Sequence, residues 1–210
     1  KAGLHQISPD RMISSGMMAR EFLRSKVRFG QVAYLGTEDS AHYIEDAGLE
    51  TIPVSEIDLD DCEDINALVL LDDEGFDWFT DLNKAVNLMR KRNIPTVVAN
   101  TDKRYPVSKG TVGIAIGGLA HLLEKIVRKR FLRFGKPDTQ MFVYAFEQMR
   151  QRVNVEKKDI LMVGDTLTTD IMGGNKFGID TCLVLTGNTR KETAKANIKS
   201  YGIIPDYICE

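Results

Sequence analysis

The 210-residue chain has few cysteines and prolines, no long apolar run, and no excess charge of either sign. No segment approaches the roughly 18 apolar residues that a membrane-spanning helix needs, so the sequence predicts no membrane association. With 28 basic and 30 acidic residues, it lacks the basic excess typical of nucleic-acid-binding proteins. The three cysteines form no CxxC pair, which favours reduced thiols in a cytoplasmic protein: Cys62, Cys182 and Cys209.

The composition that remains is that of an ordinary globular domain, with 43% hydrophobic and 28% charged residues. Apolar runs alternate with amphipathic stretches, the pattern of α/β architecture. The runs predict strands over residues 31–36, 51–54, 67–71, 95–100, 159–164 and 180–185. The amphipathic stretches predict helices over residues 40–48, 79–90, 114–129 and 141–152. Ser40 is the expected N-cap of the first of these helices.

The segment with the clearest chemistry joins an apolar strand to two aspartates. Residues 160–163 lead into Gly164-Asp165, and Asp170 follows five positions later. Ligands bind at the carboxyl ends of strands in parallel sheets, which puts Asp165 at a candidate site. Two close carboxylates need a compensating cation, and Mg²⁺ suits oxygen ligands. The alternative is structural: Asp165 ends the strand and Asp170 caps the next helix.

A lysine upstream favours the ligand-binding interpretation. Gly135-Lys136-Pro137 lies between a strand-like segment, 130–134, and the helix predicted over 141–152. We expect Lys136 to project toward the same edge of the sheet. Its ammonium group could hold a phosphoryl oxygen and offset carboxylate charge.

The order of these two segments resembles a known family. Gly-Lys-Pro followed by Gly-Asp-Thr-Leu-Thr-Thr-Asp is similar to the third and fourth motifs of the haloacid dehalogenase (HAD) phosphatases. Further segments resemble the NagD-like sugar-phosphatase branch, class IIA: residues 13–18, 32–36, 99–102, 116–118 and 173–178. The resemblance covers essentially the whole chain. It implies a Rossmann-like α/β core, three layers around a parallel sheet, with an inserted α/β cap domain.

The resemblance also implies an activity: Mg²⁺-dependent phosphomonoester hydrolysis through an aspartyl-phosphate. Asp165 is then the expected Mg²⁺ ligand, Lys136 the expected stabiliser of the phosphate, and Asp170 an acid near the metal or Lys136. The expected substrate is a small phosphorylated metabolite such as a sugar phosphate. The three histidines match no metal-site spacing and are expected to be surface or packing residues: His5, His42 and His121.

The family's first motif is not found in its expected place, nor is its second, which supplies a Thr, Ser or Asn that binds the phosphoryl group. The first motif is an Asp-x-Asp that supplies the nucleophile and the general acid. Asp58-Leu59-Asp60 has these letters, but no apolar strand leads into it and it lies in an acidic segment, 58–64, expected to be a solvated loop. We therefore expect the native protein to have a further opening segment, without which strand 161–164 exposes an edge. One carboxylate alone is expected to hold Mg²⁺ weakly.

The resemblance assigns residues 1–25 and 134–210 to the core and residues 26–133 to the cap. In this family the cap selects the substrate. The candidates that face the substrate are Asn100, Thr101, Asp102, Gly117 and Gly118.

Two structural alternatives stay open for these candidates. Residues 100–102 could be an ordinary turn. Residues 117–118 could be a tight helix–sheet contact rather than anion-binding backbone donors. The aromatic residues at 76, 78 and 79 are expected in the cap core or at an interface, and a homodimer through the cap is compatible with the family.

Two other functions compete with hydrolysis. A catalytically inactive HAD-like ligand-binding module would explain the missing nucleophile, but it gives no reason to keep Lys136, Asp165 and Asp170 together. A dehalogenase of the same superfamily needs no Mg²⁺, so the aspartate pair argues against it.

Overall fold

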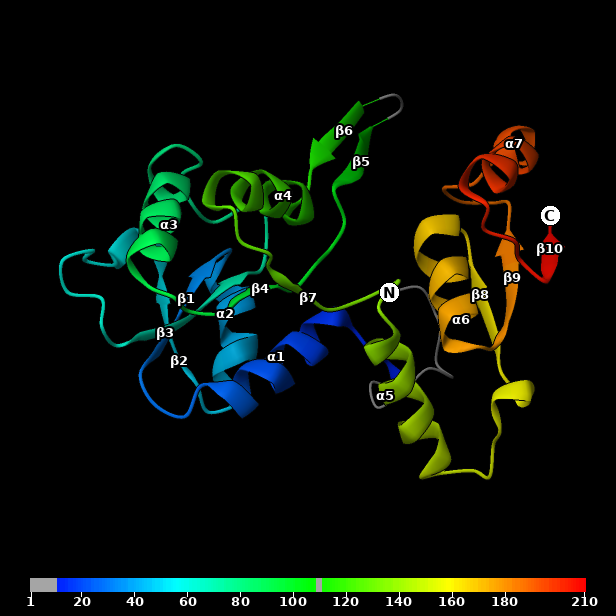
Figure 1. Ribbon diagram of the computed structural model, residues 1–210, viewed down its shortest axis with the longest axis horizontal. Coiled ribbons are helices and arrows are strands. Elements are labelled where there is room, and N and C mark those ends of the chain that lie inside the picture. Colours follow the sequence, from blue (N-terminus) through cyan, green and yellow to red (C-terminus); the bar gives the residue numbers. More distant parts are fainter. Residues whose placement is uncertain (1–10, 109–110) are drawn as a thin grey trace. The chain divides into compact units, whose positions relative to one another are not determined.

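The chain folds into two compact units, each built from parallel strands and helices (Figure 1). The computed structural model describes residues 11–108 and 111–210. Residues 14–134 form one unit, called here the larger unit. Residues 135–210, with the described residues up to Ile13, form the other, called here the C-terminal unit. The α/β prediction is confirmed. No helix in the described ranges is long and apolar enough to cross a membrane.

The larger unit contains one parallel sheet and a small hairpin. Its helices are α1 (Ser15–Lys26), α2 (Glu38–Glu45), α3 (Thr80–Lys91), α4 (Ile116–Val127) and the 3₁₀ turn η2 (Val54–Glu56). The strands of the sheet are β1 (Gln31–Leu35), β2 (Glu50–Pro53), β3 (Ile65–Leu70), β4 (Thr96–Val98) and β7 (Leu132–Arg133). They lie in the order β2-β1-β3-β4-β7, all parallel. The hairpin pairs β5 (Arg104–Ser108) with β6 (Thr111–Ile114).

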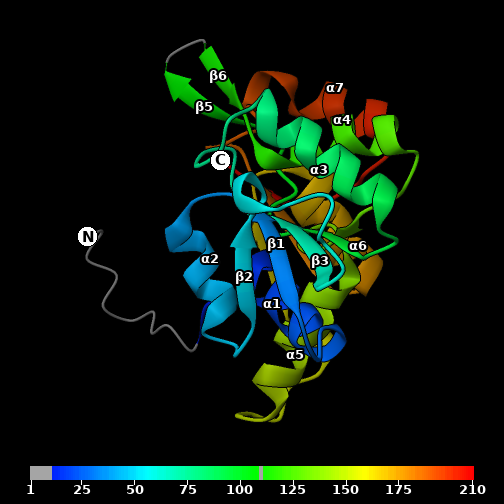
Figure 2. The same ribbon diagram turned by 90° about the vertical axis from the view of Figure 1, so that its left-hand side faces the viewer.

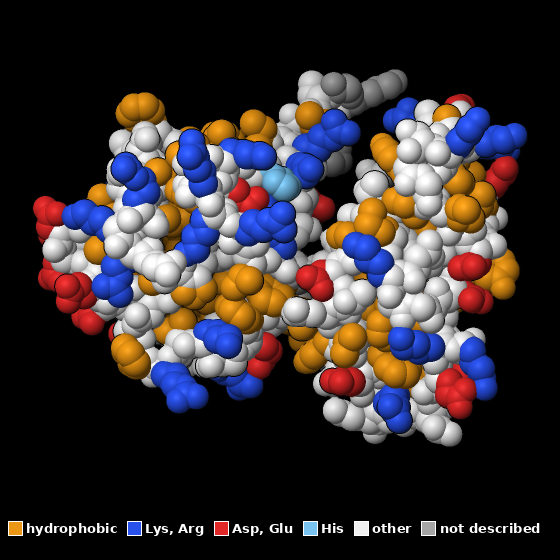
Figure 3. Space-filling view, viewed as in Figure 1, with side chains coloured by type: hydrophobic (Ala, Val, Ile, Leu, Met, Phe, Trp, Pro, Cys, Tyr) orange, Lys and Arg blue, Asp and Glu red, His pale blue; other side chains and the backbone are white. Residues whose placement is uncertain are grey.

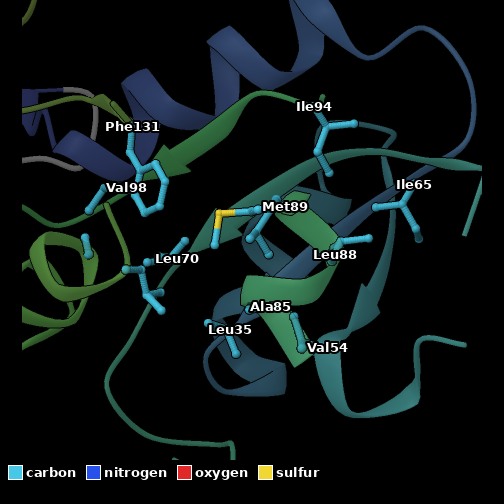
Figure 4. Close-up of a cluster of buried hydrophobic side chains, with 14 of the residues drawn as sticks. Leu35, Val54, Ile65, Leu70, Ala85, Leu88, Met89, Ile94, Val98 and Phe131 are labelled. Atoms are coloured by element: carbon cyan, nitrogen blue, oxygen red, sulfur yellow. The ribbon is translucent and has the colours of Figure 1, made fainter. Parts of the chain in front are cut away.

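Both faces of this sheet are covered, because its strands are apolar on both sides. Alternate residues of β1 and β3 enter two separate clusters. Leu35 and Leu70 pack with α3 and α4 on one face (Figure 4). Tyr34 and Val69 pack with α1 and α2 on the other face, and Figure 2 shows α2 beside β2 and β1.

The start of the larger unit differs from the expected cap boundary at residue 26. Helix α1 packs into this unit, because Ala19 and Leu23 are fully buried among residues of β1, β3 and α2. The cap of α2 also differs from the prediction. Thr37, not Ser40, is the N-cap: its hydroxyl accepts a hydrogen bond from the Ser40 N–H. The helix therefore begins two residues earlier than its apolar pattern indicates.

The acidic segment 58–64 is a loop, as predicted, between η2 and β3. Acidic side chains gather where this loop lies, at the left margin of the larger unit (Figure 3). Asp58 and Asp60 are exposed, and Asp60 pairs with Lys91 at 2.8 Å. An exposed loop carboxylate is no nucleophile at a strand end, so the structure agrees with the rejection of this Asp-x-Asp.

The C-terminal unit is smaller. Its helical elements are α5 (Thr139–Arg150), η3 (Lys157–Asp159), η4 (Leu167–Ile171), α6 (Met172–Phe177) and α7 (Lys191–Tyr201). Its strands, β8 (Leu161–Gly164), β9 (Asp180–Val184) and β10 (Tyr207–Cys209), form a parallel sheet in the order β10-β9-β8. Among the described residues β8 pairs only with β9. Its side chains Leu161 and Val163 are 48% and 53% exposed, so β8 is the expected open edge.

Candidate active site

Strand β8 carries Asp165 to the carboxyl edge of the three-stranded sheet, where α/β proteins bind ligands. Residue 164 must be glycine, because a Cβ there would lie 2.3 Å from the Cβ of Asp170. The missing side chain of Gly164 therefore lets the second aspartate fold back beside the first.

The Asp170 carboxylate closes the loop that follows β8. Asp170 lies in the π-helical turn η4 and is only 3% exposed. Its Oδ2 accepts hydrogen bonds from the N–H groups of Asp165 and Thr166, each at 3.1 Å. The helix-capping alternative is wrong for Asp170, because its carboxylate binds backbone groups that precede it and α6 has no side-chain N-cap.

Lys136 pairs with Asp170 from the loop before α5. Its Nζ lies 2.5 Å from Asp170 Oδ1. Gly135 makes the turn into this loop with a φ of +119°, a value that favours glycine. The Asp170 side chain is 5% exposed and the Lys136 side chain 41%. Both oxygens of Asp170 are thus engaged, while the Lys136 side chain remains partly exposed to solvent.

The loop after β9 holds the Asp165 carboxylate. The Asn188 N–H donates to Oδ2 at 2.7 Å, and the Thr166 hydroxyl donates to Oδ1 at 3.0 Å. The Thr189 N–H donates to the Asp165 main-chain oxygen at 3.0 Å. A Cβ at Gly187 would lie 1.9 Å from Asp165 Oδ2, so only glycine permits this approach.

These contacts favour the charged form of Asp165. The Asn188 N–H lowers the pKa of the Asp165 carboxyl most, and the Thr166 hydroxyl and the positive charge of Lys136 lower it further. Partial burial opposes these effects but does not cancel them. Asp165 is therefore ionised at neutral pH, as a ligand for a hard cation must be.

The donor set fits Mg²⁺ with one protein carboxylate. Within residues 11–108 and 111–210, no three His, Cys, Asp or Glu side chains come together as a metal cage. Mg²⁺ is commonly held by one or two carboxylates, with waters and substrate phosphate filling the other positions. Asp165 is ionised and only partly buried, and each of its oxygens keeps a free lone pair. Asp170 does not fit this role, because Lys136 and two N–H groups occupy its oxygens.

The sequence prediction brought together Lys136, Asp165 and Asp170, and the structure places all three in one cluster. It missed Gly187, Asn188 and Thr189. A sequence signal could have indicated these residues, because they follow β9, which lies beside β8 in the parallel sheet. The loops after two neighbouring parallel strands meet at one edge of the sheet. None of these three residues is charged, and therefore they did not stand out in the sequence.

The five substrate-facing candidates lie together in the larger unit. Asn100 Oδ1 accepts a hydrogen bond from the Asp102 N–H at 2.9 Å, the geometry of an Asx turn after β4. The Gly117 N–H donates to Asp102 O at 3.0 Å, and a Cβ at Gly117 would lie 2.4 Å from Thr101 O. Residues 100–102 and the start of α4 therefore form one contiguous structure.

The glycine pair serves close packing. A Cβ at Gly118 would lie 2.8 Å from Lys103 O, and the Gly118 N–H is already bonded to Ala115 O. Because the N–H groups of Gly117 and Gly118 have partners, the helix–loop contact is favoured over anion binding. Of the histidines, His42 pairs with Glu45 and His121 lies beside Glu124, whereas His5 is outside the described residues.

Comparison with known proteins gives consistent results. Residues 133–210, which contain the whole cluster, match the HAD-hydrolase-like family model. A crystal structure described as a possible sugar phosphatase of the HAD superfamily, from Cytophaga hutchinsonii, is 59% identical, with a TM-score of 0.94. That match covers 99% of this chain and 73% of the other.

Two further relatives are more distant. Chronophin from Bos taurus is 29% identical over 217 residues, covering 100% of this chain and 72% of the relative. A glycerol phosphate phosphatase from Mycobacterium tuberculosis, solved in complex with magnesium, is 25% identical, with a TM-score of 0.72. That match covers 94% of this chain and 55% of the other.

Proposed function

The chain belongs to the HAD superfamily, in its NagD-like class IIA branch of phosphatases, and we propose that it hydrolyses small phosphomonoesters with Mg²⁺. Sugar phosphates are the substrates that we propose before others. The observation that carries the proposal is the cluster at the end of β8. There an ionised Asp165 lies beside an accessible lysine that is held by a buried aspartate. An accessible cation and a carboxylate ready for a metal are what a phosphoryl group needs.

Each residue of the cluster has a distinct task in this proposal. Lys136 binds a phosphoryl oxygen and offsets charge that builds up during transfer. Asp170 holds the Lys136 ammonium group and the loop backbone, and it takes no part in the chemistry. Asp165 would hold Mg²⁺, which supplies charge neutralisation at the phosphate when bound. The magnesium in the mycobacterial relative supports this choice of metal.

The proposal includes attack by an aspartate carboxylate on phosphorus. A phosphorus–oxygen bond forms to the carboxylate as the bond to the leaving alkoxide breaks, and water then releases phosphate from the aspartyl-phosphate. We assign this nucleophile to no residue of the described ranges. Asp170 does not take the role, because Lys136 and two N–H groups engage its oxygens, and Asp165 is assigned to Mg²⁺ instead.

We assign substrate selection to the larger unit acting as a cap. Asn100, Thr101 and Asp102 form a polar turn at the carboxyl edge of its sheet, which supports contact with hydroxyl groups of a substrate. Gly117 and Gly118 shape that turn by close packing.

The proposal also includes a homodimer through the cap and a cytoplasmic location. Phe76 packs against the core, but Phe79 is 78% exposed and Trp78 is 42% exposed, which supports an interface there. The three cysteines are free, which supports a reducing compartment.

A phosphate-release assay tests the proposed activity. We expect the full chain to release phosphate from a panel of sugar phosphates and glycerol phosphate with Mg²⁺, and to lose this activity in excess EDTA. A phosphodiester of similar size serves as the control and should stay intact. No release from any phosphomonoester would contradict the proposal, and release that EDTA leaves unchanged would contradict its metal dependence.

A further inference from the structure

The Asp165 carboxylate is held from two sides by one residue, Asn188. The Asn188 N–H donates directly to Oδ2 at 2.7 Å. Its side-chain amide acts on the other oxygen through an intermediate, because Nδ2 lies 2.9 Å from Thr166 Oγ1, and that hydroxyl lies 3.0 Å from Asp165 Oδ1. Asn188 therefore acts on both oxygens of Asp165: its N–H binds Oδ2 directly, and its side-chain amide reaches Oδ1 through the Thr166 hydroxyl.

The side-chain amide of Asn188 fixes the direction of this chain of hydrogen bonds. A threonine hydroxyl has one proton to donate and lone pairs with which to accept. Because Nδ2–H donates to the Thr166 oxygen, the single hydroxyl proton remains available for Asp165 Oδ1. An ionised carboxylate can only accept, so this is the one arrangement in which all three groups are satisfied.

The exposed position of Asn188 indicates that its side chain serves this hydrogen bonding and not core packing. Asn188 is exposed, so its side chain contributes little to any buried core. Gly187 beside it has no side chain, so the loop contacts Asp165 through backbone groups, and the Asn188 amide contacts Thr166. Each oxygen of Asp165 accepts one of these hydrogen bonds, and a carboxylate oxygen has a second lone pair with which to bind a cation.

We infer that Asn188 is a positioning residue for metal binding: through Thr166 it orients the Asp165 carboxylate toward the cation. This inference rests on the proposed Mg²⁺ site. Hydrogen-bond partners of a metal ligand commonly change metal affinity by about 10- to 100-fold when removed. We expect the lower end of that range, about tenfold, because the backbone N–H of residue 188 survives substitution of its side chain.

A double-mutant cycle on the full chain tests the inference. Mn²⁺, titrated in place of Mg²⁺ and followed by water-proton relaxation, gives the dissociation constant. We expect Asn188→Ala and Thr166→Val each to weaken binding about tenfold, and the double variant to be no weaker than either single one. Thr166→Ser keeps the hydroxyl and should retain most of the affinity.

Asn175→Ala is the matched control. Asn175 is also exposed in the C-terminal unit, and its amide donates to the Ile204 main-chain oxygen at 2.9 Å, away from Asp165. Its loss should change stability but not Mn²⁺ affinity. Wild-type affinity in Asn188→Ala would overturn the inference. So would a full tenfold loss caused by Asn188→Ala in the Thr166→Val background.

A metal-free measurement separates this inference from the proposed function. The ¹³C resonance of the Asp165 carboxyl, in aspartate-labelled protein at about pH 7, reports its hydrogen bonds. We expect Asn188→Ala and Thr166→Val to shift it equally and the double variant to add nothing. If wild type binds no Mn²⁺, the metal role of the proposed function fails. Unequal or additive carboxyl shifts would overturn the Asn188 relay itself.

Discussion

Two aspartates at one strand end have opposite environments, and this difference decides their roles. Asp170 is buried and has all its oxygen partners within the protein, so it is a structural acid. Asp165 is partly exposed and keeps lone pairs free. Lys136 links the two roles, because its ammonium group pairs with the buried carboxylate and its side chain is partly exposed to solvent. Removal of the lysine should therefore affect stability as well as chemistry.

Lys136→Met should lower the free energy of unfolding by about 1.5–3 kcal/mol, because it leaves the buried Asp170 charge without its cation. The double variant Lys136→Met with Asp170→Asn should recover most of that loss but no phosphatase activity. Urea unfolding at about pH 7 measures the free energy of unfolding of the single and the double variant. Lys176→Met, at an exposed position on α6, is the matched control. Equal stability of Lys136→Met and this control would contradict the pairing.

Gly187→Ala tests the close approach of the loop to Asp165. The new Cβ would lie 1.9 Å from Asp165 Oδ2, so the loop must move and the hydrogen bond from the Asn188 N–H is lost. We expect Mg²⁺-dependent turnover to fall about tenfold or more. Gly16→Ala is the control, because a Cβ there has its nearest neighbour at 3.5 Å. Normal turnover in Gly187→Ala would show that the loop does not hold Asp165.

At the scale of elements, a partly buried ion pair joins α4 to β7. Arg133 binds Glu124 through two hydrogen bonds, at 2.6 and 2.8 Å, and the Phe131 N–H donates to the same carboxylate at 2.6 Å. The hydrogen bonds from Arg133 are the main reason that the pKa of Glu124 lies below its ordinary value of 4.5, while burial opposes this. The pair fixes the end of the larger unit just before the loop that carries Lys136.

The lowered pKa of Glu124 gives a pH dependence of stability. The carboxyl protonates more easily in the unfolded chain, so its contribution is present above pH 4.5 and is lost as pH falls through the lower folded-state pKa. We expect the free energy of unfolding of Glu124→Gln to decrease less than that of wild type as the pH is lowered from neutral through this range. Identical pH profiles for the two proteins would contradict this coupling.

The sequence predicts helices and strands well where apolar runs are long. It predicts them poorly where contacts between residues distant in the chain determine the local backbone structure. Strands β1 and β3 and helix α3 lie close to their expected places, because each buries a continuous apolar face. Strand β8 and helix α5 also lie close to their expected places, although α5 buries only Phe142 and β8 is partly exposed. The π-helical turn at 167–171 was not expected, since it depends on Asp170 folding back onto the loop. The Asn188 loop was missed because its contacts with Asp165 are made largely by backbone groups.

At the scale of the whole molecule, the chain consists of two units with separate cores. The larger unit has two apolar clusters on the faces of one sheet, whereas the C-terminal unit has two smaller clusters. The larger unit begins at Ser14, whereas the cap that the resemblance implies begins at residue 26, and that cap boundary stays a prediction. Helix α1 belongs to the larger unit because its buried residues, Ala19 and Leu23, pack against residues of that unit.

Leu68→Ala tests the separation of the two cores. Leu68 is fully buried in the larger unit, and its truncation should cost that unit about 2–5 kcal/mol. Amide hydrogen exchange should then speed up in β1 and β3, while protection in β9 stays at the wild-type level. A uniform loss of protection in β1, β3 and β9 would show that the chain unfolds as one cooperative body.

The most direct test of the phosphatase site is the Mg²⁺-dependent hydrolysis of an aryl phosphate by wild type and by Asp165→Asn. The substitution keeps the size of the side chain and removes the charge that would hold the metal. We predict that Mg²⁺ stimulates wild type and that Asp165→Asn loses about a hundredfold or more of the stimulated rate. An Asp165→Asn variant that turns over at the wild-type rate would contradict the assignment of this cluster as the active site.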